Sequence, residues 1–222
     1  MPFLIVVGAY LFASLPHLRL LCRIKCVPPQ GDLHHQLWQK AGPVWGIIGV
    51  SGDVLKGLLP VWLAKSIGLD IGFITVCGLA AVAGQMWPVF DRFNGEKGNT
   101  TGLGVAFALA WLPMLIGTLP MLAGVLSKLI KLLQLRGTPV SSRFRTGAGH
   151  SNLLPVGVAV GFLLMPVAAA LTGEPPAITA GLAVLWVLIM VRRLTADLSV
   201  DIRNKENLAP VFLNRALYDR SH

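Results

Sequence analysis

Apolar residues run along this chain in long blocks, and short polar segments separate them. The blocks cover about residues 3–21, 44–64, 69–89, 102–135, 153–171 and 177–191. Most are close to the roughly 20 residues with which an α-helix crosses a bilayer. The pattern therefore predicts an all-α, polytopic membrane protein.

The fourth block is too long for one span, because a single helix of that length would measure roughly 50 Å. Gly117-Thr118-Leu119-Pro120 lies at its middle, and proline cannot donate a helical hydrogen bond. We therefore predict two short helices here, at about 102–116 and 119–135, and about seven transmembrane helices in all.

The positions of the basic residues support this count. With seven spans and the N-terminus outside, 17 of the 19 Lys and Arg fall in the segments on the cytoplasmic side, which are 17–43, 90–101, 128–152 and 192–222. Cytoplasmic loops of membrane proteins carry such an excess. We expect a seven-span membrane domain at 1–195 and a cytoplasmic amphipathic tail at 196–222.

Composition agrees with a membrane protein and argues against nucleic-acid binding. The 222 residues are 54% hydrophobic and 13% charged, with a net charge of +9. The basic residues are scattered between apolar blocks, which is typical of loops that face anionic membrane lipids. The three cysteines lack the spacing of a metal site, and we expect neither a metal ion nor an organic cofactor.

A glycine turn stands directly before the fourth span, at Gly95-Glu96-Lys97-Gly98-Asn99-Thr100-Thr101. A helix start favours anions, glycines allow close backbone approach, and lysine adds a mobile charge. The P-loop spacing is absent. The turn is a candidate phosphate site, formed by Gly95, Lys97, Gly98, Thr100 and Thr101. The alternative is a tight turn with a Thr cap and a lysine that faces lipid headgroups.

Two charged residues lie inside the second span, Asp53 and Lys56. Their i, i+3 spacing brings them close enough to pair on a helix. Charges within a span usually face inward and have a partner. They are expected either to line a cleft or to form a structural pair between helices.

These motifs resemble those of a known family. The run Gly84-Gln85-Met86-Trp87-Pro88-Val89-Phe90 with the glycine turn, and the run Asp53-Val54-Leu55-Lys56-Gly57, are similar to sequences of the bacterial membrane glycerol-3-phosphate acyltransferases that use acyl phosphate. The resemblance covers roughly residues 10–145. It implies seven spans in the bacterial inner (plasma) membrane. It also implies acyl transfer from acyl phosphate to glycerol-3-phosphate, which makes lysophosphatidic acid in phospholipid synthesis. Arg23, Ser141 and Ser142 would then be further phosphate anchors.

The chain also departs from the family's pattern. After Arg23 the family's serine-containing motif is absent, the family's histidine is Gln85 here, and the second glycine of its turn is Glu96. His34 and His35 could supply a general base near neutral pH instead, or could be solvated loop residues. The alternative function is a non-catalytic phosphate- or lipid-binding, or lipid-moving, membrane protein on the same scaffold.

Overall fold

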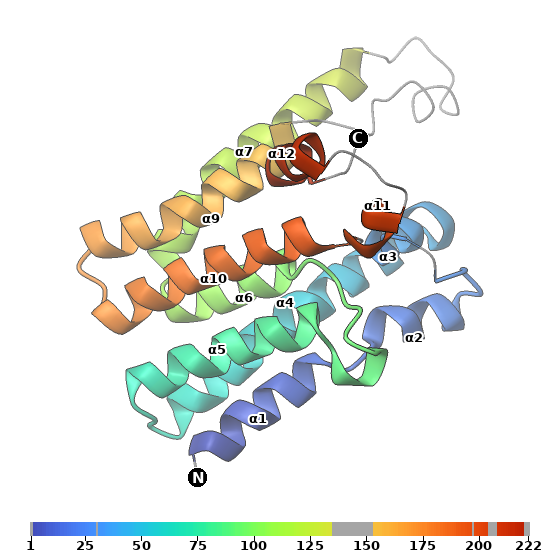
Figure 1. The fold of residues 1–222 in the computed structure, drawn as a ribbon. Helices are drawn as coiled ribbons and strands as arrows, with labels where there is room; N and C mark the ends of the chain where they lie inside the picture. The colour runs from blue at the N-terminus through green and yellow to red at the C-terminus, as the bar shows by residue number, and fades with distance from the viewer. Residues whose placement is uncertain (1, 30, 135–152, 197, 204–207, 220–222) are drawn as a thin grey trace.

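The computed structural model describes residues 2–29, 31–134, 153–196, 198–203 and 208–219, and within these ranges the chain forms helices, turns and irregular connections only (Figure 1). The expected all-α class is confirmed for this part of the chain. The long helices pack side by side as a bundle. They are α1 (Pro2–Ala13), α4 (Pro43–Ser66), α5 (Ile71–Met86), α6 (Asn99–Leu109), α7 (Trp111–Gln134), α9 (Leu153–Leu171) and α10 (Pro176–Thr195).

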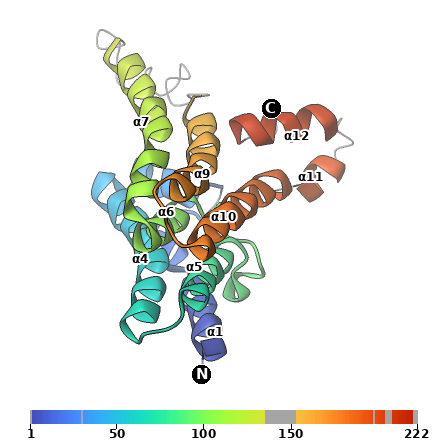
Figure 2. The same cartoon turned by 90° about the vertical axis from the view of Figure 1, so that its left-hand side faces the viewer.

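The short helices gather towards one end of this bundle, as Figures 1 and 2 show. They are α2 (His17–Ile24), α3 (Leu33–Gln36), the π-helical turn η1 (Leu37–Ala41), the 3-10 turn η2 (Val89–Asp91), α11 (Leu198–Arg203) and α12 (Leu208–Tyr218). The connections between the long helices at this end therefore carry much of the irregular structure of the described chain.

Within the described residues, five segments are long and apolar enough to cross a membrane. They are Pro2–Ile24, Pro43–Ser66, Ile71–Asp91, Leu153–Leu171 and Pro176–Thr195. Helix α6 has 11 residues, and the apolar part of α7, Trp111–Ser127, is shorter than a full span. The fold thus has several candidate spans, while the count of seven and the orientation stay predictions.

The fourth apolar block is divided into two helices, but the break is not where the sequence placed it. It lies at Ala110, whose backbone leaves the helical region at φ −151° and ψ 88°, and α7 continues through Pro120. The cause is Pro113, whose ring would clash with the carbonyl of Leu109 in a continuous helix, whereas proline is tolerated in the first turn of a new one. The prediction of a break at Gly117–Pro120 was wrong.

Helices α4 and α6 approach so closely that their backbones touch. A Cβ added to Gly57 would overlap the carbonyl oxygen of Thr101, and one added to Gly104 would overlap that of Val54. Small residues allow this kind of contact between membrane helices. The contact holds the first turn of α6 against the middle of α4, where Asp53 lies.

Candidate active site

A polar cavity of about 360 Å³ opens where α2, the segment before α3 and the loop between α5 and α6 meet. Its size is at the lower end of the range for small-ligand sites. Four cationic side chains line it, namely Arg19, Lys56, Lys97 and Arg192, with three acidic ones, Asp32, Asp91 and Glu96. The arrangement suits a small anionic ligand.

The first half of the glycine turn, Gly95 to Lys97, forms one wall of this cavity, whereas Gly98, Thr100 and Thr101 do not line it. Gly98 is the N-cap of α6 and has φ +74°, a conformation that glycine adopts without strain. Gly95 packs on the end of α5, where a Cβ would overlap the carbonyl oxygen of Gln85. The carbonyl of Gly95 also accepts a hydrogen bond from Nη2 of Arg192 on α10. Two helices therefore hold the turn in place and set the position of Lys97.

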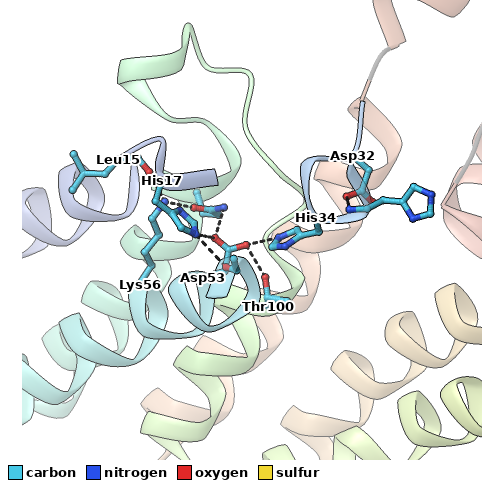
Figure 3. Close-up of polar contacts among 10 residues, drawn as sticks. Leu15, His17, Asp32, His34, Asp53, Lys56 and Thr100 are labelled. Atoms are coloured by element: carbon cyan, nitrogen blue, oxygen red, sulfur yellow. Dashed lines mark hydrogen bonds and ion pairs between the residues drawn. The ribbon is translucent and has the colours of Figure 1, made fainter. Parts of the chain in front are cut away.

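Behind the cavity, Asp53 is fully buried and collects hydrogen-bond donors from several elements (Figure 3). Its Oδ2 accepts from Nε2 of His34 at 2.7 Å and from Oγ1 of Thr100 at 3.0 Å. Its Oδ1 accepts from Nε2 of Gln85 at 2.8 Å, and Nε2 of His17 lies 3.4 Å away. An ionised carboxylate only accepts hydrogen bonds, and each of these neighbours has an N–H or O–H group that can donate to it. Asp53 thus connects α4 to α2, α3, α5 and α6.

Lys56 lies one turn further along α4 and is linked to Asp53 through Gln85. Its Nζ donates to Oε1 of Gln85 at 2.8 Å and to the carbonyl of Leu15. The amide of Gln85 therefore bridges the two charged residues, for which the spacing suggested direct pairing. Lys56 lines the cavity, whereas Asp53 stands behind it.

The structure places the two candidate catalytic histidines differently. His34 is turned inward, with Nε2 on Asp53 and Nδ1 buried next to Gly49. Burial, the largest influence, lowers the pKa of His34, but the hydrogen bond and charge of Asp53 outweigh it and the net shift is upward. His35 is exposed, and its backbone N–H donates to Asp32 Oδ1 at the start of α3. His34 belongs to the buried network, and His35 does not reach it.

The remaining predicted residues are spread out. Thr101 is buried against α4, and its hydroxyl has no hydrogen-bond partner within the described ranges. Arg23 is exposed and does not line the cavity, whereas Arg19, one turn earlier, lines it and pairs with Asp91. Ser141 and Ser142 lie outside the described residues.

The C-terminal part of the chain contacts Lys97, the lysine of the candidate phosphate site. Nζ of Lys97 contacts Oδ2 of Asp219 at 2.7 Å, and Nε of Arg193 lies 3.9 Å from Oδ1 of the same carboxylate. Asp219 follows α12, which is fixed by the buried side chain of Val211 and by a hydrogen bond from Arg215 to the carbonyl of Leu194. A carboxylate therefore occupies one side of the Lys97 ammonium group.

Sequence reasoning assigned no role to several residues that the site contains. Gln85 and His17 complete the network around Asp53, and Glu96 and Arg192 line the cavity. For Gln85 a signal existed, since a polar side chain inside an apolar span is usually functional or partnered.

The chain is similar to known proteins over most of its length. Residues 3–199 match the family model described as glycerol-3-phosphate acyltransferase. A protein of that name from Halorhodospira halophila is 34% identical over 195 residues, which cover 85% of this chain and 87% of that protein. One from Aquifex aeolicus is 32% identical over 173 residues, covering 72% and 88%. Other relatives align over a shorter part of the chain. Glycerol-3-phosphate acyltransferase 4 from Dehalococcoides mccartyi is 38% identical over 123 residues, which cover 52% of this chain and 66% of that protein.

Two solved structures share the fold. Both are of PlsY, an integral membrane glycerol 3-phosphate acyltransferase, and each comparison covers 93% of this chain and 94% of the other. The lysophosphatidic acid form has a TM-score of 0.68 at 24% identity, and the glycerol 3-phosphate form a TM-score of 0.66 at 23% identity. At this identity the likeness establishes the helical membrane fold.

Proposed function

The chain belongs to the glycerol-3-phosphate acyltransferase family, and from this premise we propose that it is a membrane acyltransferase of phospholipid synthesis with acyl phosphate as donor. The sn-1 hydroxyl oxygen of glycerol-3-phosphate attacks the acyl carbonyl, and an ester bond forms. The bond from the acyl carbon to the phosphate oxygen breaks, and phosphate leaves with the electron pair. The products are lysophosphatidic acid and inorganic phosphate.

The observation that carries this proposal is the cationic cavity beside the start of α6. Both substrates bear phosphate, and Lys56, Lys97 and Arg192 reach the same cavity from three elements. Lys97 stands just before the N-terminus of α6, and the partial positive charge at that end of the helix adds to the favourable potential for an anion. Acyl phosphate is already an activated anhydride, so positioning and charge stabilisation supply most of what the reaction requires.

Within this proposal the buried network has a positioning role. Both ring nitrogens of His34 face protein, Nε2 towards Asp53 and Nδ1 towards α4. We therefore assign His34 to holding Asp53, which in turn fixes Thr100 and, through Gln85, Lys56. The exposed His35 and Arg23 receive no role in binding or chemistry.

We further propose that the cavity faces the cytoplasm of a bacterial cell, in a seven-span arrangement with the N-terminus outside. In this arrangement α6 and the apolar part of α7 are the two short spans. The support is the charge pattern, because 17 of the 19 Lys and Arg fall in the segments assigned to that side.

The test is a direct assay of the purified protein in lipid nanodiscs, with palmitoyl phosphate and glycerol-3-phosphate and with product detection by mass spectrometry. Wild-type protein should form lysophosphatidic acid, and Lys97→Ala should lower kcat/KM by roughly 100-fold, because it removes a charge that meets a phosphate. Lys65→Ala is the matched control, because Lys65 is at the other end of α4 and contacts the carbonyl of Ala108.

Two results would contradict this account. Unchanged kinetics in Lys97→Ala would remove the glycine turn from substrate binding. Glycerol-3-phosphate binding by the wild type, without any product, would support the alternative of a non-catalytic phosphate- or lipid-binding protein.

A further inference from the structure

We propose that Glu96 is the general base of the reaction. Its carboxylate would accept the proton of the sn-1 hydroxyl of glycerol-3-phosphate as that oxygen attacks the acyl phosphate. The inference rests on the proposed function and adds a catalytic residue to it.

The first argument is position. Glu96 lines the cavity together with the cations proposed to hold the phosphates, and it stands directly between Gly95 and Lys97. Its backbone is held in place, because Gly95 donates to the carbonyl of Met86 and accepts from Arg192. A substrate whose phosphate contacts Lys97 would bring its polyol part within reach of the neighbouring carboxylate.

The second argument compares the proton acceptors that line the cavity. Asp91 is paired with Arg19, and Asp32 accepts the backbone N–H of His35. His17 uses Nε2 for the carbonyl of Gly49 and for Asp53, and its Nδ1 is buried. Asp91 and Asp32 thus already have an ion-pair or hydrogen-bond partner within the protein.

Glu96 alone among these carboxylates makes neither a hydrogen bond nor an ion pair with any residue that the structure describes. It is neither fully exposed nor fully buried. Its oxygens are therefore free to accept a proton from a bound substrate.

The electrostatic surroundings suit a base. Burial raises the pKa of Glu96 from 4.5 to about 7; the charges of Asp32 and Asp53 act in the same direction, and those of His34 and Lys97 oppose them. General bases work best when their pKa lies near the working pH. The titratable and charged groups that interact electrostatically with Glu96 are Cys22 on α2, Asp32 and His34 at α3, Asp53 and Lys56 on α4, and Lys97 in its own loop. Arg192 on α10 lines the same cavity and donates to the carbonyl of Gly95.

The step balances without a further reactant. The hydroxyl proton moves to a carboxylate oxygen of Glu96 while the hydroxyl oxygen forms the new bond to the acyl carbon. The bond from that carbon to the phosphate oxygen breaks, and phosphate takes the electron pair. Glu96 then passes the proton to the departing phosphate, which returns the carboxylate to its starting form.

The test compares wild-type protein with Glu96→Gln in nanodiscs, using palmitoyl phosphate and glycerol-3-phosphate. General-base catalysis contributes on the order of 100-fold to 10,000-fold, so kcat should fall by that amount while the KM for glycerol-3-phosphate changes little. The ratio of the two kcat/KM values should rise about tenfold between about pH 6 and pH 8, because only the wild type gains the ionised base. The titration of the substrates is common to both proteins and cancels in this ratio.

A ratio that stays constant across this pH range would overturn the proposal, even if Glu96→Gln is slow, because a purely structural role would not follow the carboxylate's ionisation. Glu96→Asp gives an independent reading if Glu96→Gln folds poorly. Aspartate keeps the carboxylate but its side chain is one methylene shorter, so kcat should fall while the pH dependence remains. An unchanged kcat would contradict the role of Glu96 as the base. Glu174→Gln, in the connector before α10 at the other end of the bundle, is the control and should match the wild type.

The failure of this inference can be told apart from failure of the proposed function. If the wild type forms no lysophosphatidic acid at any pH, the proposed function fails and Glu96 loses its role with it. If the wild type is active and Glu96→Gln equals it at every pH, the function stands and the base is wrong.

Discussion

Asp53 fixes the geometry of the site at the scale of single residues. It is buried, it accepts hydrogen bonds from His34, Thr100 and Gln85, and through Gln85 it is connected to Lys56. A buried carboxylate is stable only when donors surround it, and those donors are equally dependent on the acceptor. The network therefore acts as one unit.

The variant Asp53→Ala tests this dependence. It leaves the donors of His34, Thr100 and Gln85 without their acceptor and Lys56 without its nearby opposite charge, so we expect a loss of about 3–5 kcal/mol in stability. The thermal midpoint of the purified protein should drop by roughly 10 °C. Asp70→Ala is the matched control, because Asp70 only caps α5 through the N–H of Gly72 and should cost about 1 kcal/mol. Equal midpoints for the two variants would contradict the network's role.

Glu96 also gives a prediction about stability and pH. Its pKa is raised in the folded protein to about 7, so the folded state binds the proton more tightly than the unfolded state. The stability associated with this group is complete below about pH 4.5 and is lost as the pH rises through about 7. Glu96→Gln should therefore melt with the wild type near pH 4.5 and a few degrees above it near pH 8. A difference in melting temperature that does not change with pH would show that the carboxylate is not destabilised by burial.

At the scale of helices, close contact between α4 and α6 joins the network to the glycine turn. Gly57 and Gly104 let the two backbones meet, and Thr100, in the first turn of α6, thereby reaches Asp53. A larger residue at either glycine would push the helices apart and remove this contact. The site thus depends on helix spacing as well as on its own side chains.

Gly57→Ala tests the spacing. The added methyl group would overlap the carbonyl of Thr101, so we expect destabilisation by about 1–3 kcal/mol or more, together with a lower kcat because Thr100 moves from Asp53. Gly8→Ala on α1 is the control, since a Cβ there meets no atom within 4 Å. Thermal melting and the acyl-transfer assay on both variants provide the measurement. Similar behaviour of the two variants would mean that α4 and α6 are not tightly packed.

Asp219, which follows α12, forms an ion pair with Lys97. A substrate phosphate that binds Lys97 has to compete with this carboxylate. Asp219→Asn removes the charge that faces Lys97. We expect the KM for glycerol-3-phosphate to fall by roughly threefold to tenfold, since a charge-assisted contact of this kind is worth about 1 kcal/mol when partly exposed. In a Lys97→Ala background the same substitution should have no effect. A higher KM would instead mean that Asp219 positions Lys97 for binding.

At the scale of the whole molecule, the chain is asymmetric from end to end. The short helices α2, α3 and α11 lie towards one end, whereas the loops before α5 and α10 are at the other (Figure 1). The cavity is lined by residues of α2 and of the segment before α3. This asymmetry fits the proposed orientation, in which the basic segments face the cytoplasm.

The cysteines allow a test of the orientation. Cys26 is exposed near the end of α2, whereas Cys22 and Cys77 are buried. In intact cells a membrane-impermeant maleimide should not label the wild-type protein, and labelling at Cys26 should appear after permeabilisation. Thr172→Cys in a Cys26→Ser background places a thiol at the opposite end and should react in intact cells. The reverse pattern would invert the topology.

The position of Lys97 in a glycine turn at the start of a helix could be predicted from sequence, because the polar run with its glycines ends where the apolar block begins. In the structure Gly98 has the positive φ that such a turn requires. Which of two adjacent histidines turns inward could not. His34 and His35 have the same chemistry, and only the packing of α3 on α4 selects His34. Likewise Arg19, and not Arg23, lines the cavity, because the direction of α2 decides which turn faces it.

The sequence by itself determined the helical membrane class and the family motifs. In a bilayer no water is available to the backbone polar groups, and a helix satisfies all of them within one apolar run of span length. The tertiary structure decided what depends on contacts between distant segments. Gln85 meets Asp53 across 32 positions and Lys97 meets Asp219 across 122. The position of the break between α6 and α7 was also read only from the structure, because the sequence offers both Pro113 and Pro120 and α7 continues through Pro120. A linear pattern records the preference of each segment, whereas the site arises from where those segments are brought together.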